Sequence, residues 1–400
     1  MNPLYPSTRD SAQQRLAEFA EQAAAYSRER NFVVPDHENV SRLSPAITCG
    51  LISEQEVAQH VLARSSFPKV EKFIQEVYWR RYWKGWLEMR PAIWQQYLED
   101  LSKLAPSAEA ERLMKGEGDV AVMNQFVREL RDTGYLHNHA RMWFAAYWVH
   151  TLRLPWQLGA DFFYRHLLDA DAASNTLSWR WIAGLQTRGK TYLARASNIR
   201  KFMHEDLLYG MESGLETLTT ESAQEPTDAE FEAAQVETVY VESSLPRSIG
   251  AQAGFWVHEE DLTSDLAFPE ASSQRPILLT QSASLWVEDS SVKHQWRASA
   301  LMSTHERLVA TYKEANVSYR TGVELGDALS QWARDHELSQ IVTSAPEVGY
   351  LADQLPQIIE ALEVVGVELI CYERAEYAEL RPLSKAGFFG FWKKAQKHVI

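Results

Sequence analysis

The chain has 400 residues, of which 45% are apolar and 11% aromatic, enough to bury the cores of two or three domains. It contains no run of about 18 apolar residues, and residues 1–13 lack the apolar stretch of a secretory signal, so we expect a cytoplasmic protein without a membrane partner. The only cysteines, Cys49 and Cys371, argue against a disulfide framework, a cysteine-bound metal or an iron-sulfur cluster, and we expect no metal.

The formal net charge of -14 by itself argues against a nucleic-acid partner. This charge is divided unevenly along the chain, however. Residues 1–210 contain 26 basic and 24 acidic side chains, whereas residues 211–400 contain 14 and 30. Because an N-terminal part near neutrality can still carry a basic face, the total charge does not exclude DNA.

The N-terminal half of the sequence predicts α-helices. Apolar residues recur at helical spacing in four segments, residues 13–30, 69–87, 122–130 and 140–152. Ser53 and Glu56 have the spacing of a capping box, which marks the start of a further helix. We therefore expect residues 1–210 to form an all-α domain.

The remaining sequence predicts a linker and an α/β domain. Residues 211–253 are acidic and poor in apolar periodicity, as is typical of a linker. From residue 254 to residue 400, short β-type runs alternate with helical segments. The expected strands include residues 255–257, 277–279, 317–319, 341–342 and 367–371, and the expected helices span residues 296–315, 326–334 and 353–365. Such alternation predicts a Rossmann-like domain with a parallel sheet, so the expected fold class is multidomain α and α/β.

The region from His137 to Trp181 combines polar groups that are costly to bury without a ligand. Its sequence contains His137-Asn138-His139-Ala140-Arg141-Met142, Asp169-Ala170-Asp171, Asn175 and Trp179-Arg180-Trp181. This pattern resembles the flavin-binding helical domain of photolyases and cryptochromes. Two earlier blocks resemble the same domain in the same order, Ser41-Arg42-Leu43-Ser44-Pro45 with Gly50-Leu51-Ile52-Ser53, and Glu76-Val77-Tyr78-Trp79-Arg80. The resemblance covers roughly residues 12 to 205.

The resemblance implies FAD as the cofactor. It implies that Asn175 faces the flavin N5, that Arg141 lies along the ring, and that Asp169 and Asp171 lie near the ring and the sugar chain. The other implied cofactor contacts are Tyr26, Ser41, Arg42, Leu43 and Ser44 around the pyrophosphate, together with Arg80 and Phe163. Val40 departs from the usual threonine. The alternative is a structural Arg141–Asp169 ion pair with Asn175 as a helix cap.

The resemblance to photolyases that act on cyclobutane pyrimidine dimers also implies which residues would contact the substrate. Glu76, Asn138 and Met142 match positions that touch the flipped dimer, and Trp79 and Trp181 match the aromatic walls of its pocket. Carboxyl, amide and indole groups can hold a flipped base by hydrogen bonding and stacking. We therefore expect blue-light-driven repair of such dimers in damaged DNA by a lyase, with core packing as the alternative role of the two tryptophans.

The family's light-driven flavin reduction uses a chain of tryptophans. Trp179 and Trp156 match its first two members, and Trp143 or Trp148 could supply an alternative exit. The alternative function is a cryptochrome-like blue-light photoreceptor without repair activity, acting through a protein partner. The acidic second half and the bulkier residues 176–178, which replace a glycine-rich turn, favour it. A flavin-binding scaffold without photochemistry is a third hypothesis.

The α/β part resembles the antenna domain of photolyases, including its closing segment Gly387–Lys393. In the family that domain precedes the flavin domain, so the sequence predicts a permuted order. No Walker loop or Gly-x-Gly-x-x-Gly turn occurs here, and the identity of a second antenna chromophore stays open. The run of Lys393, Lys394 and Lys397 is expected to form a solvated helix face.

Overall fold

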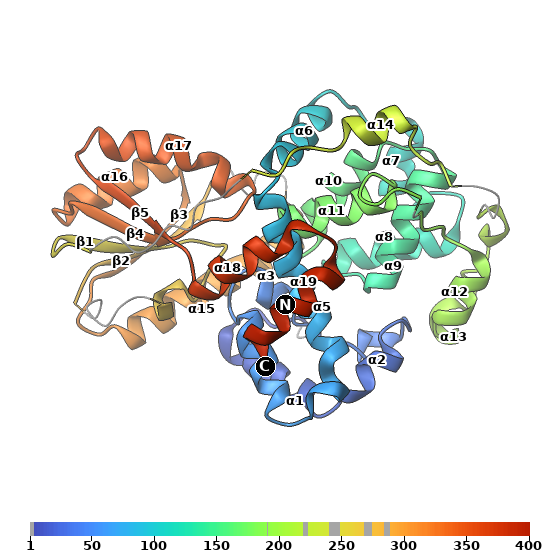
Figure 1. The fold of residues 1–400 in the computed structure, drawn as a ribbon, viewed down its shortest axis with the longest axis horizontal. Coiled ribbons are helices and arrows are strands. Elements are labelled where there is room, and N and C mark those ends of the chain that lie inside the picture. The colour runs from blue at the N-terminus through green and yellow to red at the C-terminus, as the bar shows by residue number, and fades with distance from the viewer. Residues whose placement is uncertain (1–3, 190, 219–222, 240–248, 268–273, 284–288) are drawn as a thin grey trace.

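The computed structural model describes residues 4–189, 191–218, 223–239, 249–267, 274–283 and 289–400, and it contains a helical part beside an α/β part (Figure 1). The helices of the first part are α1 (Arg9–Ala20), α2 (Tyr26–Glu29), α3 (Ser44–Thr48), α4 (Glu54–Leu62), α5 (Phe67–Glu88), α6 (Pro91–Ser102), α7 (Ala108–Met114), α8 (Ala121–Thr133), α9 (Asn138–Ala146), α10 (Trp156–His166), α11 (Ala172–Ile182), α12 (Ala196–Phe202) and α13 (Glu205–Leu208). The predicted helical character of the N-terminal half is therefore confirmed.

Two of the four helical segments are interrupted where the sequence predicted continuous helices. The first breaks after α1 into a 3-10 turn, Ala23–Ala25, before α2 begins. This break lets the ring of Tyr26 pack edge-on against Phe73 of α5, with 5.2 Å between ring centroids. The second continues beyond α9 as a π-helical turn, Tyr147–Thr151. The capping box of Ser53 and Glu56 at the start of α4 is confirmed.

The C-terminal part contains a five-stranded parallel sheet in the order β3-β2-β1-β4-β5. The strands are β1 (Ala253–Val257), β2 (Ile277–Ser282), β3 (Val317–Val323), β4 (Gln340–Ser344) and β5 (Glu368–Tyr372), and the intervening helices are α15 (Ser291–Thr311), α16 (Leu325–Asp335) and α17 (Tyr350–Glu363). Helices α16 and α17 lie on one face of the sheet and α15 lies on the other (Figure 1). The predicted parallel α/β architecture is confirmed.

Alternating side chains of β1 separate the cores on the two faces of the sheet. Trp256 packs in a core with Trp332 of α16, whereas Phe255 and Val257 belong to the core that contains Trp296 of α15. This arrangement follows from the two-residue period of a strand. The core around Trp296 continues into the helical part, so the two parts of the chain share buried apolar side chains.

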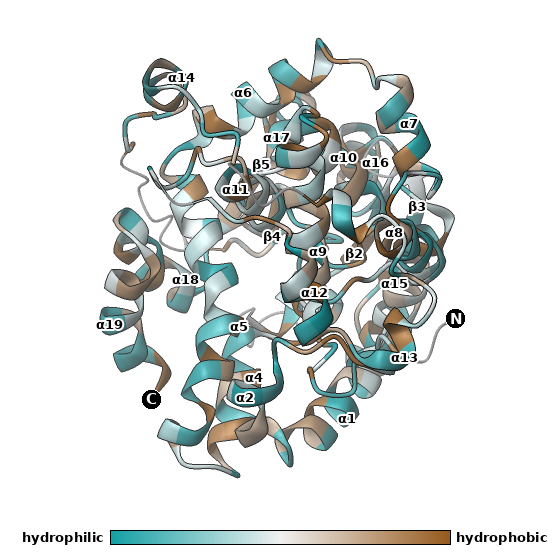
Figure 2. Cartoon of the chain, turned by 90° about the vertical axis from the view of Figure 1, so that its right-hand side faces the viewer, coloured by the Kyte–Doolittle hydropathy of each residue, from teal (hydrophilic) through white to brown (hydrophobic). Residues whose placement is uncertain are grey.

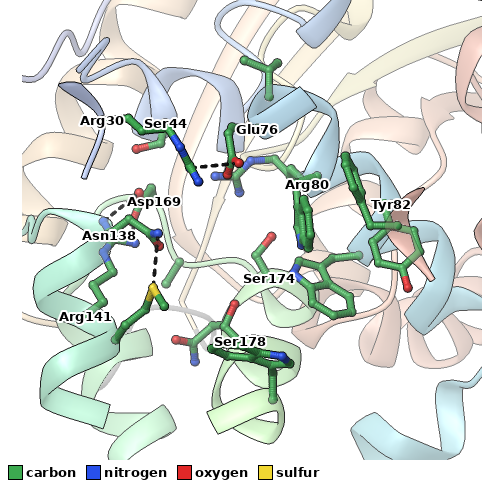
Figure 3. Close-up of a pocket in the computed structure, with 18 of the residues that line it drawn as sticks. Arg30, Ser44, Glu76, Arg80, Tyr82, Asn138, Arg141, Asp169, Ser174 and Ser178 are labelled. Atoms are coloured by element: carbon green, nitrogen blue, oxygen red, sulfur yellow. Dashed lines mark hydrogen bonds and ion pairs between the residues drawn. The ribbon is translucent and has the colours of Figure 1, made fainter. Parts of the chain in front are cut away.

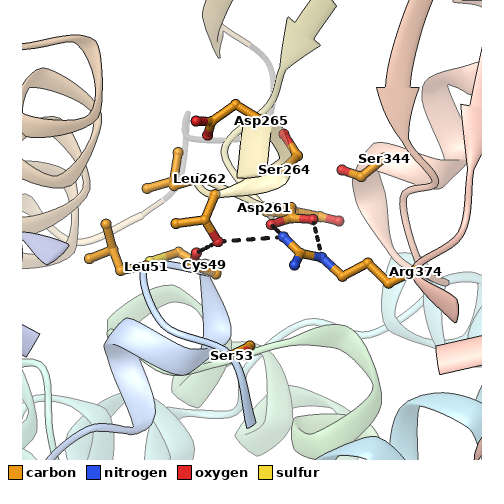
Figure 4. Close-up of polar contacts among 12 residues, drawn as sticks. Cys49, Leu51, Ser53, Asp261, Leu262, Ser264, Asp265, Ser344 and Arg374 are labelled. Atoms are coloured by element: carbon orange, nitrogen blue, oxygen red, sulfur yellow. Dashed lines mark hydrogen bonds and ion pairs between the residues drawn. The ribbon is translucent and has the colours of Figure 1, made fainter. Parts of the chain in front are cut away.

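The turn between α3 and α4 meets the loop that follows β1 (Figure 4). Leu262 N donates a hydrogen bond of 2.9 Å to Cys49 O, and Thr263 Oγ1 donates one of 2.7 Å to Gly50 O. Gly50 has a φ of +70°, and a Cβ there would lie 2.8 Å from an Asp261 side-chain oxygen. Glycine is therefore required here both by backbone conformation and by the close approach of the loop.

The last elements of the chain leave the sheet and return to the helical part. They are α18 (Ala375–Leu380), a 3-10 turn (Arg381–Lys385) and α19 (Phe388–Val399). Figures 1 and 2 both show α19 beside α5. Lys393, Lys394 and Lys397 are exposed on α19, as expected for a solvated helix face, whereas Phe391 and Trp392 are buried.

The segment expected to be a linker contains two short helices among its described residues, Leu215–Thr217 and α14 (Asp228–Ala233). It also contacts the helical part, because Arg180 Nη2 donates a hydrogen bond of 2.8 Å to Ala234 O. Within the described ranges, no helix combines the length and the apolar character needed to cross a bilayer.

Candidate functional site

A pocket of about 970 Å³ lies among α2, α5, α9 and α11 and contains most of the residues singled out in the sequence (Figure 3). The predicted site residues that line it are Tyr26, Ser41, Arg42, Ser44, Glu76, Trp79, Arg80, Asn138, Arg141, Met142, Phe163, Asp169, Asn175, Trp179 and Trp181. Its volume falls near the upper end of the roughly 300–1,000 Å³ usual for small-molecule and cofactor sites. The three sequence blocks therefore converge on one cavity.

Three predicted site residues do not line this pocket. Leu43 is completely buried in the core. Asp171 caps α11 by accepting a hydrogen bond of 2.8 Å from Ser174 N, and its other carboxylate oxygen pairs with Arg80. Trp156 stacks on Tyr97 with 5.5 Å between ring centroids.

The charge of the lining is positive although the chain as a whole is acidic. Five basic side chains line the pocket, against two acidic ones, Glu76 and Asp169. The five are Arg30, Arg42, Lys72, Arg80 and Arg141. Such an excess suits a ligand that carries negative charge, as a pyrophosphate does.

Arg141 and Asp169 form a bidentate ion pair on the pocket wall. Arg141 Nη1 and Nη2 each lie 2.9 Å from a different oxygen of Asp169, and Arg141 Nε donates to Leu136 O at 2.8 Å. Burial opposes ionisation of Asp169, but the charge and hydrogen bonds of Arg141 outweigh it and hold the pKa of the carboxyl below its usual value. The carboxylate is therefore ionised at neutral pH, and the guanidinium orientation is fixed from two sides.

The imidazole of His137 caps the first turn of α9, next to the Arg141–Asp169 pair. His137 caps the helix, because its Nδ1 accepts a hydrogen bond of 3.1 Å from His139 N. Burial, with the neighbouring His37, lowers the pKa of His137 to about 3. The imidazole is consequently neutral and keeps the lone pair that the cap requires.

Glu76 is paired with two cations from different parts of the chain. Its Oε1 lies 2.9 Å from Arg30 Nη1 and 2.8 Å from Lys72 Nζ. The sequence analysis did not identify Arg30 or Lys72 as site residues. Lys72 stands four residues before Glu76 on α5, a spacing that could have revealed it, whereas Arg30 directly follows α2 and no local pattern indicates the contact.

The aromatic base of the pocket is built by α10 and α11. The rings of Phe163 and Trp179 pack edge-on with centroids 5.1 Å apart, and Asn175 Nδ2 donates a hydrogen bond of 2.8 Å to Ala160 O. This bond ties α11 to α10 and fixes the orientation of the Asn175 amide. It also means that Asn175 links two helices instead of capping one.

Trp148 contacts Trp179, which the resemblance matched to the first member of the family's tryptophan chain. The centroids of the two rings are 6.3 Å apart in an edge-on arrangement, and Trp148 Nε1 donates a hydrogen bond of 2.8 Å to Pro155 O, next to Trp156. Trp143 instead stacks on His139. Of the two alternative exits considered from the sequence, Trp148 is the one adjacent to Trp179.

The opposite end of the pocket lies near Ser41 and Arg42. Arg42 has a left-handed backbone with a φ of +57°, and its Nη1 donates to Asp36 O at 2.9 Å. Four buried polar atoms of pocket-lining residues lack a hydrogen-bond partner, namely Arg42 Nε, His137 Nε2, Ser174 Oγ and Gln186 Oε1. Buried polar groups are usually partnered, so these atoms indicate a polar ligand. Together with the positive lining, they fit FAD.

The C-terminal end of the chain contributes a wall that the sequence analysis did not assign to this site. Ala386, Gly387, Phe388 and Phe389 line the pocket beside α5. The sequence analysis identified this segment only as the end of the antenna-like domain. Its amphipathic pattern indicates a packed helix but not the surface on which the helix packs.

A second cavity of about 200 Å³ lies where β1 and β4 end at the edge of the sheet. Charged side chains fill much of its surroundings, since Arg81 pairs with Glu54 at 2.9 Å and with Glu347 at 2.7 Å. Arg81 and Lys84 lower the pKa of Glu347 to about 2 against the effect of burial. The cavity is below the roughly 300 Å³ at which cofactor sites usually begin, so we assign no second chromophore to it.

Comparison with known proteins identifies the helical part. Residues 73–207 match a model of the FAD binding domain of DNA photolyase, which supports FAD as the cofactor of this part. The chain is 30% identical over 202 residues to the deoxyribodipyrimidine photo-lyase of Synechococcus sp., covering 47% of this chain and 41% of that protein. It is 32% identical over 171 residues to the deoxyribodipyrimidine photo-lyase of Thermus thermophilus, covering 42% and 40%.

The chain thus spans about two fifths of the length of these curated relatives. Among solved structures, a bacterial class III photolyase from Agrobacterium tumefaciens is 22% identical, with a TM-score of 0.45, over 57% of this chain and 50% of that one. A cryptochrome from Synechocystis sp. is 22% identical, with a TM-score of 0.41, over 49% and 43%. The matched domain and the sequence relatives agree, and they show that the helical part of the chain is similar to the FAD binding domain of DNA photolyases.

Proposed function

We propose that the pocket binds FAD and that the chain is a light-driven lyase that repairs cyclobutane pyrimidine dimers in damaged DNA. The observation that carries this proposal is the union of two residue sets in one cavity. Arg141, Asp169 and Asn175, which match flavin contacts, line the same pocket as Trp79 and Trp181, which match the walls of the dimer site. A photolyase needs both sets at one place, because an electron must pass between the cofactor and the lesion.

On this proposal the inner pocket holds the cofactor. When bound, FAD supplies visible-light absorption and one-electron chemistry. The Arg141 guanidinium, fixed by Asp169, orients the ring, and the Asn175 amide, fixed by Ala160 O, offers its oxygen to a donor at the ring edge. Arg42 and the Ser41 hydroxyl bind the pyrophosphate. The buried Trp179 and Phe163 exclude water from the ring.

The outer pocket holds the lesion. Asn138 is exposed at the mouth and its Nδ2 lies 3.7 Å from Met142 Sδ, so the amide can turn toward an incoming base. Trp79 and Trp181 are half-buried, which leaves indole surface for stacking. Glu76 would have to exchange one of its contacts with Arg30 and Lys72 for a contact with the base. The exposed lysines of α19 are suited to phosphates that flank the lesion.

Two observations favour a second candidate function, a blue-light photoreceptor. Glu76 already has two cationic partners, and one face of Trp79 is covered by Phe388. Both contacts reduce what the outer pocket can offer to a dimer. A photoreceptor needs the cofactor site without the lesion site, and a protein partner would then receive the signal.

The test is blue-light-dependent loss of dimers from an irradiated thymine oligonucleotide, measured with the FAD-loaded full chain. We expect repair by the unaltered protein and its loss in the double variant Glu76→Ala, Trp79→Ala, since both lesion contacts are removed. The exposed Glu99 of α6 lies outside the pocket, so Glu99→Ala is a matched control that should retain repair. Bound FAD is measured in every variant from its absorption.

The outcomes separate the two functions. Repair that persists in the double variant would contradict the assigned lesion site. An unaltered chain that retains FAD and undergoes photoreduction, yet neither binds nor repairs the dimer, would favour the photoreceptor.

A further inference from the structure

The wall contributed by the C-terminal segment includes a direct ring contact with the pocket. Phe388 stacks on Trp79 with 3.8 Å between ring centroids and 22° between ring planes. Phe388 is 4% exposed, whereas Trp79 remains half-buried. One face of the Trp79 indole is therefore occupied by a residue more than 300 positions later in the sequence.

Several contacts hold Phe388 in this place. Tyr82, one turn after Trp79 on α5, packs edge-on against Phe388 at 5.6 Å and donates a hydrogen bond of 2.8 Å from its hydroxyl to Ala386 O. Farther along α19, Trp392 Nε1 donates to Glu71 Oε1 at 3.1 Å. The start of α19 is thus anchored to α5 on both sides of Trp79, and Phe388 forms a fixed wall.

This wall has a consequence for any planar ligand in the outer pocket. An indole has two faces for stacking, and Phe388 covers one of them. Trp79 also meets Tyr82 and Trp83 edge-on, with centroids 6.2 and 6.3 Å apart, but Phe388 is the ring that stacks on its face. Phe388 therefore contributes to defining the plane of the indole. A ligand ring must then stack on the remaining face, in the plane that Phe388 imposes.

We propose that Phe388 is a positioning residue for the lesion: it fixes the ring plane of Trp79 so that the indole presents one face to a nucleobase in the pocket. The inference rests on the proposed function, since a nucleobase lesion is the ligand. It adds to the proposed lesion site a residue from the C-terminal helix α19. The specificity of the outer pocket depends on α19 as well as on the helical part.

The test is a double-mutant cycle on lesion discrimination. The quantity measured in the dark is the ratio of affinities of the FAD-loaded chain for an oligonucleotide with a single cyclobutane thymine dimer and for the same oligonucleotide without damage. We expect Phe388→Ala to lower this ratio about fivefold, on the scale of one aromatic contact. In a Trp79→Ala background, Phe388→Ala should have no further effect, because the ring that it positions is gone.

Two further variants separate positioning from general damage to α19. Phe388→Tyr keeps the ring and should restore the ratio. Lys394→Ala changes the exposed face of the same helix and should leave the ratio unchanged while weakening binding to both oligonucleotides alike. Bound FAD and the midpoint of thermal unfolding, recorded for each variant, report cofactor binding and folding.

Each result has a defined meaning. A Phe388→Ala effect of equal size in the Trp79→Ala background, or no effect of Phe388→Ala on a discriminating protein, overturns the inference and leaves the repair proposal standing. An unaltered chain that holds FAD but does not discriminate the dimer overturns both. Loss of FAD from Phe388→Ala would assign the wall to the cofactor and would likewise overturn the inference.

Discussion

Among single residues, Asp169 forms a buried ion pair on the wall of the pocket. Its side chain is 4% exposed and its two oxygens are engaged by the two terminal nitrogens of Arg141. Replacing one member of a buried pair leaves the other charge uncompensated, which costs far more than losing an exposed pair. The sequence analysis considered this ion pair, because an arginine and an aspartate buried in a helical region need each other or a ligand.

We predict that Asp169→Asn lowers the free energy of unfolding at pH 7 by about 3 kcal/mol, measured by urea denaturation. Because the folded-state pKa of Asp169 lies below its usual value near 3.8, its stabilising effect is fully present above that pH. The effect is lost as the pH falls through the lower folded-state pKa. The difference between the two proteins should therefore narrow below pH 3.8.

A matched control is the exposed pair of Arg320 with Asp335, whose atoms are 3.2 Å apart. Asp335→Asn should change stability by less than about 1 kcal/mol. An equal loss in both variants would contradict the special role of the buried pair.

For single residues, the sequence predicted which side chains share the site but not all of their contacts. The motif blocks predicted Glu76, Arg141 and Asn175 as members of a single site, and the pocket brings them together. The pairing of Glu76 with Arg30 was not predicted, because Glu76 lies on α5 and Arg30 follows α2, and the two meet only through tertiary packing. Asp171 was predicted to lie beside the cofactor. In the structure, its carboxylate caps α11 and forms an ion pair with Arg80.

At the scale of elements, the contact between α10 and α11 depends on a glycine. A Cβ at Gly159 of α10 would lie 2.4 Å from the Trp179 ring and 3.2 Å from the Trp148 ring. Neither ring can move freely, because both are buried. The absence of a side chain at residue 159 therefore lets the two tryptophans approach each other.

Gly159→Ala should lower the free energy of unfolding by about 1–3 kcal/mol, because the clash exceeds the gain in helix propensity. It should also slow light-driven reduction of bound FAD, which is read from the loss of the oxidised flavin absorption, since Trp179 must shift. Gly390→Ala on α19 is the control: its added Cβ meets only Ala386 Cβ at 4.0 Å, so stability should be unchanged or higher. Photoreduction at the normal rate in Gly159→Ala would contradict a role for Trp179 in its observed position.

Element boundaries were predicted unevenly, for physical reasons. The periodic segments over α8, α16 and α17 were predicted well because the buried residues of each helix lie mainly on one face. The break between α1 and α2 was not predicted, since its residues are compatible with a helix and only packing of Tyr26 against Phe73 explains the turn. The π-helical turn after α9 likewise depends on tertiary context.

At the scale of the whole molecule, the C-terminal segment of the chain returns to the pocket of the helical part, where Ala386 to Phe389 form part of the lining. Local patterns predicted a helical part followed by a parallel α/β part, and this order is observed. They could not predict that α19 returns to α5, because an amphipathic helix defines its buried face without naming its partner. The division into domains at residues 210 and 254 accordingly stays a prediction, since the described part of the chain contains buried contacts across both boundaries.

The distribution of charge also differs between the whole chain and the pocket. The chain is acidic as a whole, yet the pocket lining has five basic and two acidic residues. Selection of an anionic cofactor is thus local, and the total charge of -14 does not govern it.

Binding of FAD by this pocket is tested by the absorption spectrum of the purified full chain after loading with FAD and removal of unbound cofactor. We predict flavin bands corresponding to an equimolar complex, and their loss in Arg141→Ala, with Arg320→Ala as the folded control that keeps them. A correctly folded chain that retains no flavin, or an Arg141→Ala variant that retains as much as the unaltered protein, would show that this pocket does not bind FAD through Arg141.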